Sequence, residues 1–205
     1  MIEHYDLLVI GSGPGGQRAA IQAAKLGKRV AVVEKSDQLG GAGLRAGTIP
    51  TKTLREAALV LSGVAGSGLL TNKRLIRRNV TINELTAVAR DVVTTQLHVL
   101  EDAFARNHIE VVWGQAHFED AHTMLVAGED RARTVTADYV VIATGTRAAQ
   151  PAHVPFNDRN VFTTDTFRDL QRLPRSILIV LTLSSPSTRT VCASSKRACP
   201  HTTSI

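Results

Sequence analysis

Residues 5–35 read YDLLVIGSGPGGQRAAIQAAKLGKRVAVVEK and predict the start of an α/β domain. Leu7–Ile10 is a short, partly β-branched apolar run, as expected for a buried parallel strand. The run stops at Gly11, an alanine-rich stretch continues to Gly27, and a second apolar run covers Arg29–Val33. This order predicts a strand, a helix and a second strand parallel to the first.

Three glycines between the first strand and the helix have the spacing G-x-G-x-x-G, at Gly11, Gly13 and Gly16. The first permits a tight turn, the second lets backbone N–H groups approach a pyrophosphate, and the third allows close packing of helix on sheet. The N-terminus of a helix also attracts anions. Glu34 ends the second strand, where a carboxylate accepts hydrogen bonds from a ribose. We predict a dinucleotide-binding turn; the alternative is a glycine-rich turn that binds nothing.

Composition indicates a water-soluble globular protein. The 205 residues permit one large domain or two small ones, with 43% hydrophobic and 20% charged residues. No apolar run approaches the roughly 20 residues that span a bilayer, so we expect no membrane insertion. The first strand starts almost at the N-terminus, which leaves no room for a signal peptide and makes the cytoplasm the expected compartment.

The net charge of +6 includes Arg189, Lys196 and Arg197, which lie in a C-terminal stretch without acidic residues. The net positive charge of the rest of the chain is too small to indicate nucleic-acid binding. Both cysteines, Cys192 and Cys199, lie in the same stretch. Their spacing, like that of the histidines, fits no common metal site, so we expect neither a disulfide framework nor a bound metal.

The middle of the chain predicts two helices. Residues 36–47 are expected to form a glycine-rich loop, and Thr48 is the expected N-cap of a helix that ends near Gly63. Residues 63–80 are expected to be an irregular, basic surface segment. Asn83–Arg106 has apolar residues at near-helical spacing and predicts a long amphipathic helix.

Four further strands are expected. Ile109–Trp113 and the core strand Tyr139–Ala143 are the more apolar, whereas Phe118–Ala127 and Arg133–Asp138 flank a predicted turn at residues 128–130. Alternating strands and helices predict a doubly wound α/β sheet, with a small antiparallel insert between residues 114 and 138.

Three motifs in this order resemble the flavoprotein pyridine nucleotide-disulfide oxidoreductase family. They are GSGPGG at residues 11–16, GGAGLRAGTIPTK at residues 40–52, and ATG at residues 143–145 after an apolar strand. The resemblance covers about residues 1–180. It implies an α/β Rossmann-type FAD-binding domain with a parallel sheet and a small antiparallel insert.

Within that family, GTIPTKTLR at residues 47–55 is most similar to the soluble pyridine nucleotide transhydrogenases. This implies hydride transfer from NADPH to NAD through FAD. The two positions where most members carry redox cysteines are Gly43 and Thr48 in this chain, and transhydrogenases also keep the first cysteine. Without thiols no disulfide relay operates, which disfavours a dihydrolipoamide dehydrogenase, glutathione reductase or mercuric reductase.

The resemblance also implies which residues hold FAD. Glu34 would bind the adenosine ribose, Thr48 would lie beside the isoalloxazine ring, Lys52 would reach toward flavin N5, and the backbone of Ala116 would contact adenine. Alternatively, Lys52 is a surface lysine and Thr48 only an N-cap. The sequence predicts no definite catalytic residue; Thr48 and Lys52 are the candidates only because they would lie near the flavin. The full set of expected cofactor-binding residues is Gly11, Gly13, Pro14, Gly15, Gly16, Glu34, Lys35, Gly40, Gly41, Thr48, Lys52, Ala116, Ala143, Thr144 and Gly145.

The resemblance stops after Val180. Residues 1–175 are expected to form an incomplete FAD-binding domain, and residues 176–180 match the first strand of an NAD-binding domain. Residues 181–205 are rich in serine and threonine and lack glycine, which predicts a disordered tail. We hypothesise a shift of coding frame just after Val180, a truncated product, and loss of the NAD domain, of the return segment of the FAD domain and of the domain through which family members form homo-oligomers.

Three functional hypotheses remain open. The chain is a transhydrogenase by family, an FAD-binding module without turnover, or a truncated product without function. The missing second glycine fingerprint favours the last two, because hydride transfer needs donor and acceptor held together.

Overall fold

The computed structural model divides the chain into two compact units, Met1–Leu170 and Gln171–Ile205. The residues whose structure it describes are 3–61, 81–129, 131–157, 160–163, 165–166, 170, 174, 176–181 and 189–193. The expected basic segment 63–80 lies outside this set.

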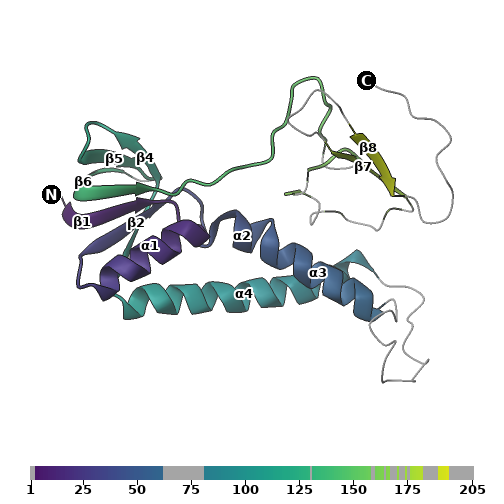
Figure 1. Cartoon of the computed structure of the whole chain (residues 1–205), viewed down its shortest axis with the longest axis horizontal. Helices are drawn as coiled ribbons and strands as arrows, with labels where there is room; N and C mark the ends of the chain where they lie inside the picture. The colour runs from purple at the N-terminus through teal and green to yellow at the C-terminus, as the bar shows by residue number, and fades with distance from the viewer. Residues whose placement is uncertain are drawn as a thin grey trace. The chain divides into compact units, whose positions relative to one another are not determined.

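A six-stranded sheet in the order β3-β2-β1-β6-β5-β4 forms the first unit (Figure 1). Four strands run parallel and two, β4 and β5, run antiparallel to their neighbours. The fold is therefore α/β and Rossmann-like, with an antiparallel insert, as the sequence predicts. The strands are β1 (Glu3–Ile10), β2 (Val30–Glu34), β3 (Glu110–Trp113), β4 (Gln115–Phe118), β5 (Thr123–Ala127) and β6 (Ala132–Ile142).

Four helices accompany the sheet: α1 (Pro14–Lys25), α2 (Gly41–Arg45), α3 (Thr48–Leu61) and α4 (Ile82–Arg106). The α1 helix and the C-terminal half of α4 cover one face of the sheet, whereas α3 continues beyond it and lies against the N-terminal half of α4 (Figure 1). This arrangement brings the start of α1 close to α2 and α3.

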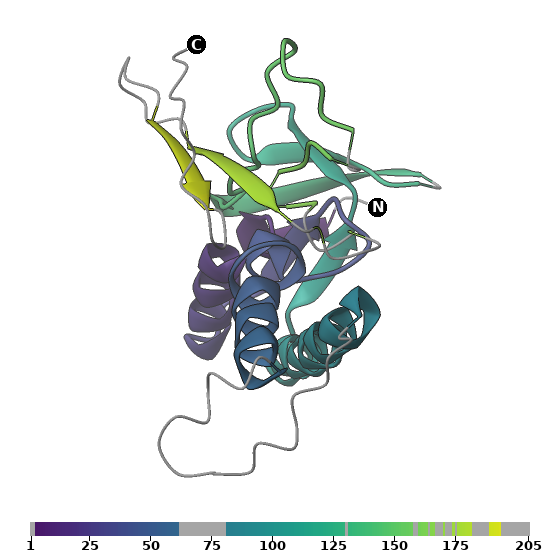
Figure 2. The ribbon, with the colours of Figure 1, turned by 90° about the vertical axis from the view of Figure 1, so that its right-hand side faces the viewer.

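The core has two layers, one on each face of the parallel strands; the helices that cover one of these faces lie below the sheet in Figure 2. On the helical face, Val9 and Val32 pack with Ala20 of α1 and Phe104 of α4. On the other face the insert supplies the cover, through fully buried residues of β5, β6 and the parallel strands. Burying one such side chain contributes roughly 1.5–3 kcal/mol, so both layers hold the sheet. The second layer includes Tyr5, Leu8, Val33, Met124, Val126 and Val135.

The long helix α4 begins one residue earlier than predicted because Thr81 caps it. The Thr81 hydroxyl accepts a hydrogen bond from the Glu84 backbone N–H at 3.3 Å, and the Glu84 carboxylate accepts one from the Thr81 N–H at 3.0 Å. This capping box satisfies two groups that the helix itself leaves without partners. The helix ends at the expected place, with Asn107 as C-cap.

Two expectations for residues 36–52 are wrong. The predicted loop contains the short helix α2, and Thr48 is the first residue of α3 instead of its N-cap. The carbonyl of Gly47 accepts hydrogen bonds from the backbone N–H and the hydroxyl of Thr51, at 3.2 and 2.5 Å. Gly47 therefore occupies the capping position, and the glycine-rich composition concealed a helical turn.

The insert differs in its boundaries from the prediction. The strand expected at Phe118–Ala127 is shorter and starts at Thr123 as β5, because Asp120 accepts hydrogen bonds from the backbone N–H groups of His122 and Thr123 and forms a turn; the preceding strand β4 was not predicted. The two strands expected at Arg133–Asp138 and Tyr139–Ala143 are one continuous strand, β6.

The second half of β6 is not a core strand as expected. Residues 132–136 pair with β5 and residues 135–142 with β1, but residues 138–142 have a neighbouring strand on one side only, within the described part of the chain. Tyr139 is 74% exposed and Ile142 66% exposed. An open strand edge with apolar side chains results, which is a known aggregation hazard.

The second unit contains the hairpin of β7 (Ile177–Leu181) and β8 (Arg189–Ala193). The expected strand at residues 176–180 is therefore present. The prediction of a wholly irregular tail is wrong for β8, which pairs antiparallel with β7 and places Thr190 opposite Val180.

Candidate functional site

The carboxyl ends of the four parallel strands meet at one edge of the sheet. Backbone hydrogen bonds join them directly beyond their last residues: Gly11 N–H donates to Val33 at 2.8 Å and Ala143 N–H donates to Ile10 at 2.8 Å. Gly114 N–H donates to Glu34 at 2.9 Å. Ligands of open α/β sheets bind outside this edge, and the motif residues predicted from sequence follow it.

Two glycines of the first motif have no room for a side chain. Gly11 has a φ of 102°, and a Cβ there would lie 2.5 Å from the carbonyl oxygen of Ala143. A Cβ on Gly16 would collide with the carbonyl oxygen of Gly11. Gly41, from the second motif, is as confined, because its Cβ would lie 2.7 Å from the Cα of Gly13. The two glycine motifs are thus packed on each other.

The other two glycines of the first motif face open space. No heavy atom lies within 4 Å of a Cβ built on Gly13 or on Gly15. Gly13 is the N-cap of α1, no side chain caps this helix, and its first turn holds no acidic residue. The first N–H groups of a helix have no partner within it. Free N–H donors beside empty space therefore form a cradle of the kind that holds a phosphate.

The Glu34 carboxylate is buried beside this cradle, with 5% of the residue exposed. Its Oε2 accepts hydrogen bonds from the Ser12 hydroxyl at 2.6 Å and the Ser12 N–H at 2.9 Å, and its Oε1 accepts one from the Ser36 N–H at 3.0 Å. Burial raises the pKa of this carboxyl, but the hydrogen bonds from Ser12 and Ser36 outweigh it and lower the pKa below its ordinary value. Glu34 is therefore an anionic acceptor at neutral pH.

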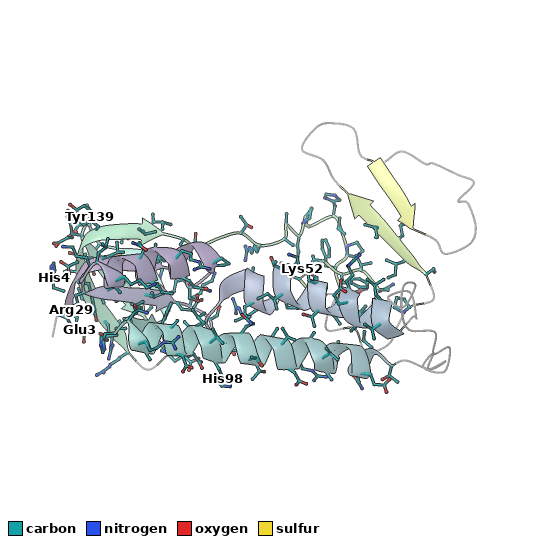
Figure 3. The ribbon with its side chains drawn as sticks, turned by 60° about the horizontal axis from the view of Figure 1, so that its bottom comes forward. Glu3, His4, Arg29, Lys52, His98 and Tyr139 are labelled. Atoms are coloured by element: carbon teal, nitrogen blue, oxygen red, sulfur yellow. The ribbon has the colours of Figure 1, made fainter. Side chains whose placement is uncertain are left out.

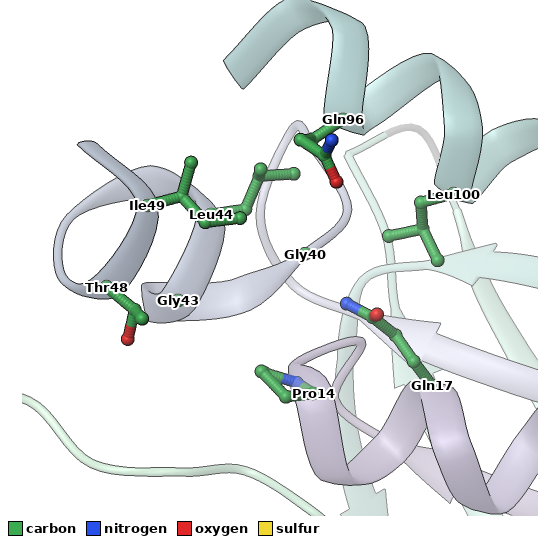
Figure 4. Close-up of a pocket in the computed structure, with 9 residues that line it drawn as sticks. All are labelled: Pro14, Gln17, Gly40, Gly43, Leu44, Thr48, Ile49, Gln96 and Leu100. Carbon is green, nitrogen blue, oxygen red and sulfur yellow. The ribbon is translucent and has the colours of Figure 1, made fainter. Parts of the chain in front are cut away.

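A cavity of about 170 Å³ lies between α1, α2, α3 and α4 (Figure 4). Gln17 of α1, Thr48 of α3 and Gln96 of α4 contribute its polar side chains. Ligand pockets usually measure about 300–1,000 Å³, so this space alone does not hold a dinucleotide. It is lined by Pro14, Gln17, Gly40, Gly43, Leu44, Thr48, Ile49, Gln96 and Leu100.

The remaining predicted residues are more dispersed. Thr144 and Gly145 follow β6 at the same edge and are exposed. Lys35 is exposed one residue beyond Glu34, and Lys52 is exposed on α3, well away from the amino end of the sheet where Glu3 and Arg29 lie (Figure 3). Ala116 lies in β4 and packs against the core on the insert side. The structure brings the glycines, Glu34 and Ala143 together, and it leaves the roles of these dispersed residues as predictions.

Sequence reasoning missed the polar residues that support the site. Ser12 occupies a variable position of the glycine motif, yet it is fully buried and bonded to Glu34 and Gly40. Gln17 donates its side-chain amide to the Ser12 carbonyl at 2.9 Å. A short hydroxyl residue inside the motif was the one available signal; nothing in the sequence marks Gln17.

Neither a metal site nor a membrane-spanning helix is found among the described residues. Among the residues whose placement is described, no group of three or more His, Cys, Asp or Glu side chains could hold a metal ion. None of the helices in that part of the chain combines the length and apolar character needed to cross a membrane.

Comparison with known proteins identifies relatives of this chain. A family profile described as "Pyridine nucleotide-disulphide oxidoreductase" matches residues 5–180. A soluble pyridine nucleotide transhydrogenase from Mycobacterium bovis is 44% identical over 183 residues, which is 87% of this chain and 39% of the relative. A protein of the same name from Vibrio vulnificus is 39% identical over 177 residues, 86% of this chain and 38% of the relative. The chain thus spans about two fifths of the length of these relatives.

A solved structure also resembles this chain. The HOCl-induced flavoprotein disulfide reductase from Escherichia coli superposes with a TM-score of 0.66 and 25% sequence identity. The match covers 84% of this chain and 35% of the reductase. Both the sequence and the structural comparison therefore match about two fifths or less of longer proteins.

Proposed function

Because this chain belongs to the pyridine nucleotide-disulphide oxidoreductase family, we propose that it binds FAD at the carboxyl edge of its sheet. The observation that carries the proposal is the open cradle at Gly13 and Gly15, at the uncapped start of α1. A glycine-rich turn with a purely structural role would need Gly11 and Gly16, which are packed, but it would not need glycine at the two open positions.

The residues present fit the two polar parts of the ADP half of FAD. The N–H groups at the start of α1 would hold the pyrophosphate, since they supply donors and the positive end of the helix dipole. The Glu34 carboxylate would accept hydrogen bonds from the adenosine ribose. The packing of Gly41 on Gly13 places the second motif next to the cradle, where its backbone can also approach the cofactor.

The other half of FAD would lie toward α3. Thr48, at the start of α3, would flank the isoalloxazine ring, and Lys52 lies one turn further along the same helix. The ammonium group of Lys52 would stabilise negative charge on the ring. The flavin itself supplies hydride acceptance and donation. The remaining predicted residues, Pro14, Lys35, Gly40, Ala116, Ala143, Thr144 and Gly145, would contribute backbone or peripheral contacts.

For the whole protein we propose the transhydrogenase reaction, hydride transfer from NADPH to NAD through FAD, in the cytoplasm. The names of the relatives support this activity. Thr48 also supports it, because a disulfide reductase relays electrons through a pair of thiols and needs a cysteine at this position, whereas Gly43 departs from the reductases and the transhydrogenases alike. The 205 residues of the chain hold one glycine fingerprint of this kind, so we propose for this chain by itself an FAD-binding module without turnover.

A flavin titration tests the proposal. FAD fluorescence should be quenched saturably by the purified chain, with one equivalent bound. FMN, which lacks the AMP moiety and keeps only one phosphate, is the matched control and should bind at least about ten-fold more weakly, since it forgoes the ribose contact to a charged group. Equal affinity for FAD and FMN, or no binding of FAD, would contradict the proposal. Addition of NADPH without oxygen should leave the bound flavin oxidised; bleaching would contradict the absence of turnover.

A further inference from the structure

Ser12 links three segments that are distant in sequence. It lies in the turn after β1, is fully buried, and bonds to Glu34, which is 22 residues away at the end of β2. Its hydroxyl also accepts a hydrogen bond at 3.0 Å from the N–H of Gly40, which is 28 residues away at the start of α2. Both glycine motifs and the predicted ribose acceptor thus meet at one hydroxyl group.

The hydrogen bonds at Ser12 have a defined direction. A hydroxyl has one proton to donate, and the Ser12 proton goes to Glu34 because a carboxylate only accepts. The backbone N–H of Gly40 can only donate, so it occupies a lone pair of the Ser12 oxygen. The chain of donors therefore runs from Gly40 through Ser12 to Glu34. If either of these hydrogen bonds ran in the opposite direction, a buried donor or acceptor would be left without a partner, which is unfavourable.

This network decides which carboxylate oxygen remains for a ligand. Oε2 of Glu34 already accepts two hydrogen bonds from Ser12, at 2.6 and 2.9 Å, which fill its two lone-pair positions. Oε1 has one backbone donor, the Ser36 N–H at 3.0 Å. A ligand hydroxyl therefore has access only to Oε1, where it would compete with the rotatable Ser36 hydroxyl. Without the Ser12 hydroxyl, the carboxylate would be held at Oε2 by a single backbone N–H.

We propose that Ser12 is a positioning residue for ribose recognition: its hydroxyl fixes the Glu34 carboxylate so that Oε1 is presented to the hydroxyl groups of an adenosine ribose. The same hydroxyl holds Gly40, so the ribose acceptor and the second glycine motif keep their mutual placement. This inference rests on the proposed binding of FAD. It adds a residue that contacts no ligand itself and that acts through Glu34.

The test compares ADP with 2′,3′-dideoxy-ADP, which lacks both ribose hydroxyl groups, by calorimetric titration of the full chain. The unaltered chain should bind ADP about ten-fold or more tightly than the dideoxy compound, because a hydrogen bond to a charged group is lost. In Ser12→Ala this ratio should fall toward one, through weaker ADP binding with dideoxy-ADP little changed. Thr95→Ala, which removes an exposed hydroxyl on α4, should keep the full ratio.

A merely structural role would give a different result. If Ser12→Ala weakens both nucleotides equally and keeps the ratio, the positioning role is wrong while the proposed FAD site stands. If the unaltered chain binds neither nucleotide, the proposed FAD site and this inference both fail. Ser12→Cys, which preserves size but donates weakly, should lower the ratio as well and serves where Ser12→Ala does not fold. In Glu34→Gln the ratio should already be low, and adding Ser12→Ala should not lower it further.

Discussion

The two ends of the parallel sheet each hold a hydroxyl bonded to a carboxylate at 2.6 Å, but their surroundings differ. At the carboxyl end Ser12 donates to Glu34, next to open glycines and free helix N–H groups. At the amino end the Tyr5 hydroxyl lies 2.6 Å from a carboxylate oxygen of Glu110 and 3.0 Å from one of Glu3, and its single proton serves these two acceptors. A short hydrogen bond therefore does not mark a binding site; the donors and the empty space around it do.

The amino end is closed by its own side chains. The Arg29 guanidinium lies 4.8 Å from the centre of the Tyr5 ring, and Arg133 lies 4.0 Å from Glu110. Burial, together with the hydrogen bonds and the negative charge of Glu110 and Glu3, raises the pKa of the Tyr5 phenol. The phenol thus stays protonated and serves the fold, whereas Glu34 stays ionised and is suited to accept hydrogen bonds from a ligand.

The largest effect is expected from Gly16→Ala at the carboxyl end. The added methyl group would collide with the Gly11 carbonyl oxygen, so we expect a loss of about 3 kcal/mol or more in the free energy of unfolding. Gly15→Ala adds the same group one residue earlier, where nothing lies within 4 Å, and should be neutral or stabilising by up to about 1 kcal/mol. Urea unfolding of both variants measures the difference; equal stabilities would show that the motif is not packed as described.

A smaller effect is expected from Tyr5→Phe at the amino end. The carboxylates of Glu110 and Glu3 lose the one proton donor that they share, which should lower the free energy of unfolding by about 1 kcal/mol. The dissociation constant for FAD should not change, because this end of the sheet carries no part of the cradle. Tyr139→Phe is the matched control, since Tyr139 is 74% exposed, and it should change neither quantity. A clear loss of FAD affinity in Tyr5→Phe would contradict the division of roles between the two ends.

The two ends should also respond to opposite extremes of pH. The lowered pKa of Glu34 stabilises the fold above its ordinary value of 4.5, and this contribution is lost as the pH falls through the lower folded value. The raised pKa of Tyr5 stabilises the fold below its ordinary value of 10.0, and this contribution is lost as the pH rises above it. Unfolding midpoints across pH should show the acid loss reduced in Glu34→Gln and the alkaline loss reduced in Tyr5→Phe. The reverse assignment would refute this division between the two ends.

Local signals explain what could be predicted from the sequence. The first strand, helix and second strand follow from an apolar run, a glycine spacing and a second run within 31 residues, and the parallel sheet follows from their order. The position of Glu34 beside the glycine motif could also be predicted, because Glu34 ends β2, the strand that pairs with β1.

Features that depend on long-range contacts could not be predicted in this way. Ser12 gains its role from Glu34 and Gly40, which the fold alone brings to it. The helix α2 forms in a glycine-rich stretch that disfavours helices by composition, where Gly41 packs on Gly13. The exposure of Tyr139 is equally invisible in an apolar run, because it depends on which strand lies beside β6.

The most direct test of the central claim is FAD titration of Gly13→Asp, together with its thermal unfolding. Aspartate is a favourable N-cap and has room at this position, so the unfolding midpoint should stay the same or rise. Its carboxylate would occupy the proposed phosphate cradle and repel the pyrophosphate, so FAD affinity should fall by about a hundred-fold. Gly13→Asn, of equal size but neutral, should lose much less. An aspartate variant that is folded and binds FAD like the unaltered chain would contradict the proposed cradle.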